Sequence, residues 1–453
     1  MKRLLSTLFI ICMITAVGFT LNGVTKNRTS QGCIQLTDFY RLPEQTVDVL
    51  CIGSSHVYYS IHAPRLYDRY GMAAYLLASP GQPVWMSYYF LEEALKTQSP
   101  RLVVFDVCTL YRREADAGSA SWPSLISMKP SVRKWKAIRA VNQEGKQLDS
   151  IAAFFSFPYY HTRYDELNRQ DYENTKRVRY NGYFPSFERI SESELSQWKD
   201  ADRTNPGLAE PLAARAETYL RRLIELCQKK ELPLLLVNSP YLNQTLEKQK
   251  AYNYVSLIAQ EYGVPYLDGN YIEEMQIDFK EDLLEASHLN YFGSIKYTDY
   301  LAGWMKQHYL IPDRRGNAGY RSWEETSRKF RHQQLYTRVL KQIQTQKAYL
   351  EAVQQLDECT VVFYDKKSGA AAVCENGKKV FEGAPDSDYF RHFDLGYSDL
   401  AVGCSSGNLS VRLDRKEYLF AQDGLNVLVY DKIAKRVIDG AGFTAGKRAA
   451  AKT

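Results

Sequence analysis

Short apolar runs alternate with amphipathic stretches over most of the chain. Apolar runs of four to seven residues, bounded by glycine, proline or polar residues, predict buried strands at 47–52, 73–77, 101–107, 232–237 and 264–267. Helical spacing between these runs predicts helices at 62–70, 83–97, 211–230, 246–262 and 291–308. Strands that alternate with helices are typical of an α/β fold with a parallel sheet covered on both faces.

The alternation is interrupted and then ends, which suggests a domain plan. Residues 26–312 form the α/β domain, and the polar, aromatic stretch 112–210 is interpreted as a large insertion with some helix. A polar helical linker is expected over 313–357. Short strand-like runs broken by glycine or Asn-Gly turns then predict a mostly β domain over 358–445, followed by a disordered tail over 446–453.

The first 25 residues bear on the compartment. Lys2 and Arg3 precede an uncharged run over 4–24, which has the roughly 20 residues that a membrane-spanning helix needs. We expect a single-pass anchor in the cell membrane over 1–25. The alternative is a signal peptide cleaved near 16–18, with secretion of the remainder. Under both interpretations the rest of the chain lies outside the cytoplasm.

Composition and charge exclude several classes of function. The 453 residues are 45% hydrophobic and 24% charged, which argues against intrinsic disorder and a multi-pass membrane protein. The net charge of +6 is too dilute to predict nucleic-acid binding. None of the eight cysteines forms a C-x-x-C pair, so we expect no metal site and no cofactor.

Two short stretches carry the candidate chemistry. Ser55 follows the first predicted strand, where open α/β folds place their sites and where helix amides can accept negative charge. Glu285 precedes His288 by three residues, just before the last predicted helix, a spacing at which a carboxylate can orient an imidazole. Taken singly, the serine turn is better explained as a helix cap, and the histidine is better explained as a surface or capping residue.

Together, the serine after the first strand and the late acid-x-x-His block resemble the SGNH (GDSL-type) hydrolase superfamily. The resemblance implies a three-layer, flavodoxin-like parallel sheet over about 46–310. It implies Ser55 as nucleophile, His288 as general base and Glu285 as the orienting acid. A glycine amide in the family's second block contributes to the oxyanion hole. Here the matching turn is 78–82, and Gly81 is the candidate beside the amide of Ser55.

The chain departs from the family pattern in three places. Ser54 stands where many members carry aspartate, and Glu285 replaces the usual aspartate, with Asp282 a substitute at the wrong offset. The block that supplies an oxyanion-hole asparagine after the third strand is missing, and Asp106 stands there instead. An ionised carboxylate only accepts hydrogen bonds, so Asn238 after the fourth strand is the remaining candidate donor.

Within the superfamily, the chain looks most like the membrane-anchored branch that acylates cell-surface polymers. The DltD-like proteins of teichoic-acid D-alanylation and the AlgJ/AlgX-type polysaccharide acetyltransferases are examples. The resemblance implies a cell-surface polymer as acceptor and a membrane-bound O-acyltransferase as the partner that delivers the acyl group. Candidate substrate contacts are His56 beside the nucleophile and His161 and Arg163 in the insertion, where an arginine can bind phosphate or carboxylate.

The C-terminal part has a resemblance of its own. Residues 424–431, 437–439 and Phe443 are similar to the interleukin-like EMT inducer domain, a module that accompanies surface-carbohydrate enzymes in bacteria. That similarity bears on the fold and on the kind of protein it accompanies, not on chemistry.

Two functions remain open at this point. The first is an extracytoplasmic serine acyltransferase or esterase that uses a Ser55-His288-Glu285 triad and acts on a surface polysaccharide or teichoic-acid-like polymer. The second is a non-catalytic polymer-binding or scaffold protein on a degenerate SGNH fold. They differ in one geometric expectation, because catalysis requires Ser55 Oγ within hydrogen-bond reach of His288.

Overall fold

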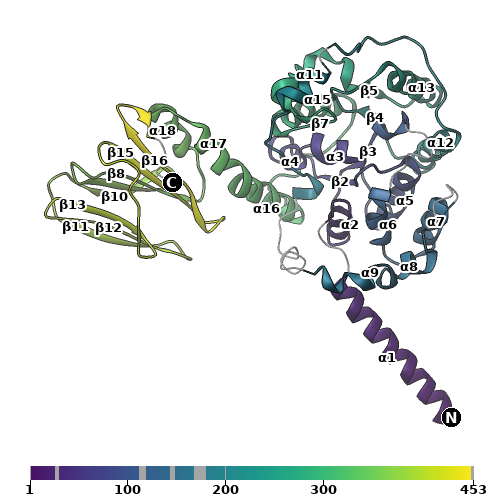
Figure 1. Ribbon diagram of the computed structural model, residues 1–453, viewed down its shortest axis with the longest axis horizontal. Helices are drawn as coiled ribbons and strands as arrows, with labels where there is room; N and C mark the ends of the chain where they lie inside the picture. The colour runs from purple at the N-terminus through teal and green to yellow at the C-terminus, as the bar shows by residue number, and fades with distance from the viewer. Residues whose placement is uncertain are drawn as a thin grey trace. The chain divides into compact units, whose positions relative to one another are not determined.

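The computed structural model describes residues 2–25, 30–111, 119–142, 148–167, 180–198 and 200–449. The chain divides into two compact units, Met1–Ser327 and Arg328–Thr453, called here the N-terminal and C-terminal units (Figure 1). Helix α16 (Arg321–Phe330) crosses the division.

A parallel five-stranded sheet forms the centre of the N-terminal unit and confirms the α/β prediction. The strand order is β2-β1-β3-β4-β5, the order of flavodoxin-like folds. The residues of the first four strands are all buried, which explains their continuous apolar runs. The strands are β1 (Val49–Gly53), β2 (Ala74–Ala78), β3 (Leu102–Asp106), β4 (Leu234–Asn238) and β5 (Tyr266–Asp268).

Helices cover both faces of this sheet. Helix α15 packs against α3 and α4 on one face, and α5 packs against α12 on the other (Figure 1). The helices of this layer structure are α2 (Cys33–Phe39), α3 (Ser55–Ser60), α4 (Ala63–Tyr70), α5 (Val84–Ala94), α12 (Ala214–Lys229), α13 (Leu246–Tyr262) and α15 (Tyr291–His308). The connections from β1, β3 and β4 therefore all emerge at the carboxyl ends of neighbouring strands, where α/β folds place their sites.

The expected insertion between β3 and β4 is built of short helices in its described part. They are α6 (Trp122–Ile126), α7 (Val132–Asn142), α8 (Ser150–Phe155), α9 (Phe157–Tyr160) and α11 (Glu192–Gln197). Helix α9 and the 3-10 turn η4 (His161–Asp165) lie against the N-terminal helix α1 (Lys2–Thr25). Within the described residues, no helix combines the length and hydropathy needed to cross a bilayer. The anchor expected over 1–25 therefore stays a prediction that the structure does not support.

The C-terminal unit contains two antiparallel sheets with a core between them. The strand orders are β10-β9-β8-β15-β16-β17 and β11-β12-β13-β14. The strands are β8 (Cys359–Asp365), β9 (Ala370–Glu375), β10 (Lys378–Gly383), β11 (Tyr389–Asp394), β12 (Asp399–Ser405), β13 (Asn408–Leu413), β14 (Lys416–Glu417), β15 (Leu425–Asp431), β16 (Arg436–Thr444) and β17 (Lys447–Arg448).

Two segments of this unit differ from the expected plan. Helices α17 (Tyr336–Gln342) and α18 (Gln346–Gln354), expected in a linker, bury Leu340, Tyr349 and Val353 against the six-stranded sheet. The tail expected to be disordered from 446 begins with strand β17, because Arg448 pairs with Phe443 and its guanidinium bonds Asp439. Residues 450–453 lie outside the described residues.

Candidate active site

Ser55 is the first residue of α3, directly after the carboxyl end of β1. Gly53 ends the strand, and a Cβ there would lie 2.8 Å from Val57 Cγ2 and 3.0 Å from Asp106 Cβ, so glycine allows this close approach. Ser54 caps the helix by accepting a hydrogen bond from His56 N at 3.4 Å. The amide of Ser55 lies in the first helical turn, where backbone N–H groups have no acceptor within the helix.

His288 and Glu285 face each other across a short hairpin. The hairpin consists of β6 (Leu283–Glu285) and β7 (His288–Leu289), and its register pairs Glu285 with His288. Ala286 N donates to Glu194 Oε1 at 2.9 Å, and Ser287 N donates to Glu285 Oε2 at 2.8 Å. The turn and the carboxylate are thus both held in place by backbone hydrogen bonds.

The three predicted side chains form one hydrogen-bonded series. Ser55 Oγ lies 2.7 Å from His288 Nε2, and His288 Nδ1 bonds Glu285 Oε1. Burial raises the pKa of Glu285, but the hydrogen bonds from His288 and Ser287 outweigh burial and hold that pKa below its usual value. An ionised Glu285 accepts a hydrogen bond from the N–H group at His288 Nδ1. The proton of the neutral ring therefore stays on Nδ1, and the lone pair of Nε2 faces the serine hydroxyl.

The site is open to solvent on one side and aromatic on another. The side chain of His288 is 19% exposed and that of Glu285 is 35% exposed. The Tyr59 ring lies 4.8 Å from the His288 ring, and the exposed Phe184 ring lies 5.7 Å from Tyr59. A solute can therefore reach Ser55 beside a wall of rings.

A second hydrogen-bonded series runs beside the first. Ser239 Oγ donates to Asp106 Oδ2 at 3.0 Å, and His56 Nδ1 lies 3.2 Å from the same hydroxyl. Asp106 and Ser239 follow neighbouring strands β3 and β4, while His56 belongs to α3. All three residues are buried. The series brings a second imidazole to within 5.0 Å of the His288 ring, measured between centroids.

Asp106 has an unusual titration for an aspartate. Burial raises its pKa to about 6, although hydrogen bonds from Cys108 and Ser239 and the nearby His288 act in the opposite direction. This carboxyl occupies the strand end where the resemblance expected an asparagine. It therefore serves as an acceptor for Ser239 when ionised, and supplies no oxyanion donor.

Gly81 lies in the loop after β2, next to the turn that connects β1 to Ser55 at the start of α3. The sheet register pairs Gly53 with Ala78, and Ser79 N donates to Gly53 O at 3.4 Å. The two loops thus begin side by side at the edge formed by the strand ends. This placement keeps Gly81 as a candidate oxyanion donor.

The remaining candidates near the sheet take other roles. The Asn238 amide donates to Asp268 Oδ1 at 3.2 Å and joins the ends of β4 and β5. The carboxylate of Asp282, the alternative acid, accepts from Lys296 Nζ at 2.6 Å. The Asn238 amide and the Asp282 carboxylate are thus bonded to other groups, and Glu285 is the acid that bonds His288.

The structure does not bring the two candidates of the insertion to the serine. His161 Nδ1 lies 2.6 Å from Pro158 O, and Arg163 lies 3.7 Å from Glu166. Both belong to the η4 turn beside α1, well separated from α3 in Figure 1. Of the predicted substrate contacts, only His56 lies at the site.

Sequence reasoning missed Ser239, Tyr59 and Phe184. Ser239 follows a buried strand, as Ser55 does, and that position was the available signal. Tyr59 is one helical turn after Ser55, so its proximity followed from the helix. Nothing local indicated Phe184, which reaches Tyr59 from the insertion.

Comparisons with known proteins add little to this geometry. No family model matches the chain, and no curated sequence matches it. Among solved structures, the chain is similar to a candidate acylhydrolase from Bacteroides fragilis. The similarity has 12% sequence identity and a TM-score of 0.31, and it covers 60% of this chain and 94% of that chain. The chemistry of the site therefore rests on its own side chains.

Proposed function

We propose that the N-terminal unit is a serine-dependent acyl-transfer enzyme, an esterase or O-acyltransferase, with Ser55 as nucleophile. One observation carries the proposal, which is the 2.7 Å contact between Ser55 Oγ and His288 Nε2 with Glu285 bonded to the other ring nitrogen. Ser55 and His288 are 233 residues apart in the chain. A nucleophile, a base and an orienting acid in series are the arrangement that activates a serine.

In the proposed reaction, His288 Nε2 takes the hydroxyl proton while Ser55 Oγ attacks the acyl carbonyl carbon. Glu285 stabilises the imidazolium that forms. The amides of Ser55 and Gly81 donate to the oxyanion, and each such donor contributes about 3 kcal/mol in studied enzymes. Collapse expels the leaving group with the proton from His288. Water or an acceptor hydroxyl then attacks the acyl-enzyme with His288 again as base.

The acceptor and partner extend this proposal. The sequence resemblance supports a hydroxyl on a surface polysaccharide or teichoic-acid-like polymer outside the cytoplasm. Tyr59 and Phe184 support a ring-shaped acceptor, because an aromatic wall beside the nucleophile packs well on sugar rings. Without cytoplasmic acyl-CoA, transfer requires a membrane-bound O-acyltransferase as donor. Hydrolysis requires no such partner.

A non-catalytic polymer-binding role is the second candidate. It is favoured by Asp106, because the strand end where the superfamily carries an oxyanion donor here holds an acceptor. The two candidates predict opposite outcomes for a simple acyl ester.

The test is hydrolysis of p-nitrophenyl acetate by the full chain, with and without a polyol acceptor. We expect Ser55→Ala and His288→Ala each to lower kcat by about 10³-fold or more. Ser54→Ala is the matched control, since it removes the helix cap and leaves the nucleophile in place. If the wild type hydrolyses the ester no faster than Ser55→Ala does, the result favours the non-catalytic role.

A further inference from the structure

The outer face of the four-stranded sheet in the C-terminal unit is hollowed along its middle. Along β12, Leu400, Val402 and Cys404 point into the core. The residues between them, Ala401 and Gly403, alternate to the outer face. Their small side chains leave a floor lower than the strands on either side.

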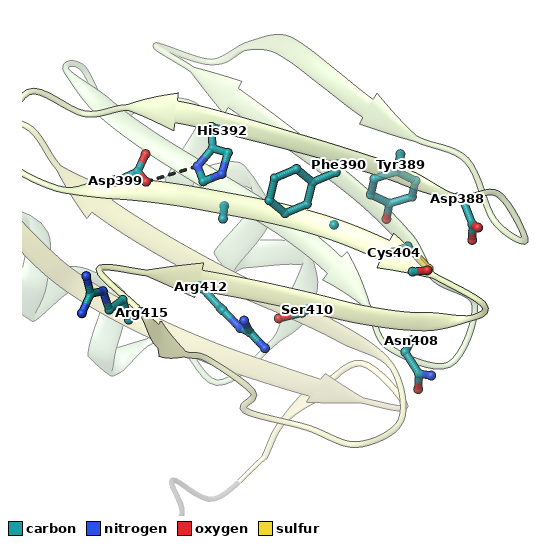
Figure 2. A pocket seen from close by; sticks show the side chains of 13 residues that line it. Asp388, Tyr389, Phe390, His392, Asp399, Cys404, Asn408, Ser410, Arg412 and Arg415 are labelled. Atoms are coloured by element: carbon teal, nitrogen blue, oxygen red, sulfur yellow. Dashed lines mark hydrogen bonds and ion pairs between the residues drawn. The ribbon is translucent and has the colours of Figure 1, made fainter.

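Larger side chains form the two walls of this groove. Strand β11 contributes Phe390 and His392, and β13 contributes Ser410 and Arg412 (Figure 2). The register sets Phe390 and Ser410 on opposite sides of Gly403. The groove has a volume of about 710 Å³, within the range of small-molecule sites.

The Phe390 ring lies directly over the backbone of the floor. A Cβ at Gly403 would lie 2.5 Å from Phe390 Cδ2, so glycine is required for this placement. The ring is nevertheless 64% exposed, and His392 extends the aromatic wall with its ring centroid 4.8 Å away. An aromatic side chain packed over a groove and left largely uncovered presents apolar area that the core does not use.

The groove also contains polar side chains that have no partner among the described residues. Ser410 Oγ is buried and has no hydrogen-bond partner among the described residues. The side chains of Arg412 and Arg415 are exposed, and within the described part of the chain neither makes an ion pair or side-chain hydrogen bond. Unpaired guanidinium groups are suited to bidentate binding of a carboxylate.

The opposite end of the groove is suited to hydroxyl groups. Asp388 and Asn408 lie there (Figure 2). Ser406 N donates to Asp388 Oδ1 at 2.8 Å, which holds the carboxylate in place with Oδ2 available as an acceptor. The groove thus offers acceptors for hydroxyl protons at one end and an aromatic face in the middle. Arg412 and Arg415 lie toward the other end, where the Asp399 carboxylate is paired with His392 at 3.1 Å.

We propose that this groove binds an acidic saccharide, a pyranose chain that carries carboxylate groups. The C–H face of a pyranose ring is weakly positive and packs on the negative face of Phe390. Its carboxylate pairs with Arg412 and Arg415, and its hydroxyls bond Asp388 and Asn408. The site is independent of Ser55 and stands whether or not the N-terminal unit is catalytic.

The experiment is calorimetric titration of the full chain with uronic-acid tetrasaccharides of the galacturonate, mannuronate and glucuronate types. We expect at least one to bind, and its carboxyl methyl ester to bind at least about tenfold more weakly because the ester removes the charge that Arg412 pairs with. Phe390→Ala and Arg412→Gln are expected to weaken binding by about tenfold each.

Matched controls lie on the same unit outside the groove. Tyr397→Ala removes an exposed ring and Arg436→Gln removes an exposed guanidinium, and both are expected to bind as the wild type does. Polyglutamate tests whether charge alone suffices. The proposal is overturned if no uronate tetrasaccharide binds at millimolar concentration, if polyglutamate binds equally well, or if Phe390→Ala binds like Tyr397→Ala.

Discussion

The imidazole of His56 lies beside that of His288, with ring centroids 5.0 Å apart. Ser239 uses its hydroxyl proton to bond Asp106, so its oxygen accepts from His56 Nδ1. This fixes the proton of a neutral His56 on Nδ1. A neutral ring at that distance does not repel the positive charge that His288 gains in the proposed reaction, whereas a protonated ring would.

Ser239→Ala tests this positioning role. The substitution removes the hydroxyl that lies 3.2 Å from His56 Nδ1, and we expect kcat for ester hydrolysis to fall by about three- to tenfold with little change in KM. Ser294→Ala, a buried serine on α15 that bonds Tyr183, is the matched control. Equal effects of the two substitutions on kcat would show that Ser239 matters for packing alone.

Substitutions at Glu285 test its role in the Ser55–His288–Glu285 series. Glu285→Gln keeps the shape but presents an amide that no longer stabilises the imidazolium, and we expect kcat to fall by about 10²- to 10⁴-fold. Glu285→Asp withdraws the carboxylate by one methylene and is expected to retain intermediate activity. Steady-state kinetics at neutral pH show which of the two variants retains the higher kcat. A Gln variant as active as the Asp variant contradicts an electrostatic role.

Asp106 gives the stability of the N-terminal unit a distinct pH dependence. Burial raises its folded pKa from 3.8 to about 6, so between these values the folded chain binds a proton that the unfolded chain does not. Stability therefore rises as pH falls through that window, by at most about 3 kcal/mol. Melting temperatures of the wild type relative to Asp106→Asn, from pH 7 to pH 4, measure it. If the melting temperatures of the wild type and Asp106→Asn change with pH in parallel, the pKa of Asp106 is not raised by folding.

Asn290 joins the β6–β7 hairpin to the start of α15. Its Oδ1 accepts from Phe292 N at 2.9 Å and Gly293 N at 3.1 Å, and caps the helix. Its Nδ2 donates to three backbone carbonyls, those of Glu188, Glu281 and Leu283.

Asn290→Asp keeps the cap and removes the three donated bonds. We expect the free energy of unfolding to fall by about 2–3 kcal/mol, because buried carbonyls are left facing a carboxylate. Denaturant titration measures the loss. Asn317→Asp, at an exposed cap, is the control and is expected to change stability by about 0.5 kcal/mol or less. If both variants lose a similar amount of unfolding free energy, the three bonds donated by Asn290 do not contribute the expected stability.

The sheet was predictable because its strands are buried on both faces. A run such as 49–53 has no polar position, and its neighbours share that property, so the sequence signal is strong. The sequence predicts a linker where helices α17 and α18 lie, because only a narrow apolar stripe, with Leu340 and Tyr349 on it, interrupts their polar surface. Strand β17 escaped prediction because two basic residues carry no strand signal without Asp439 beside them.

Local spacing explains which parts of the site were predictable. Glu285 and His288 are three residues apart and pair across one hairpin, so the sequence contains their relationship. Ser239 and Asp106 are separated by 133 residues, and only the strand order β1-β3-β4 brings them to His56. His161 and Arg163 were wrongly expected near the serine for the same reason, because local composition does not encode where an insertion packs.

The most direct test of the central claim is to locate the activated serine chemically. The full chain is treated with a fluorophosphonate, digested, and mapped by tandem mass spectrometry, alongside His288→Ala and the Ser54→Ala control. We expect one modified residue, Ser55, in the wild type and in Ser54→Ala, and none in His288→Ala. Modification at another serine, equal modification of Ser55 without His288, or no modification of the folded wild type would contradict it.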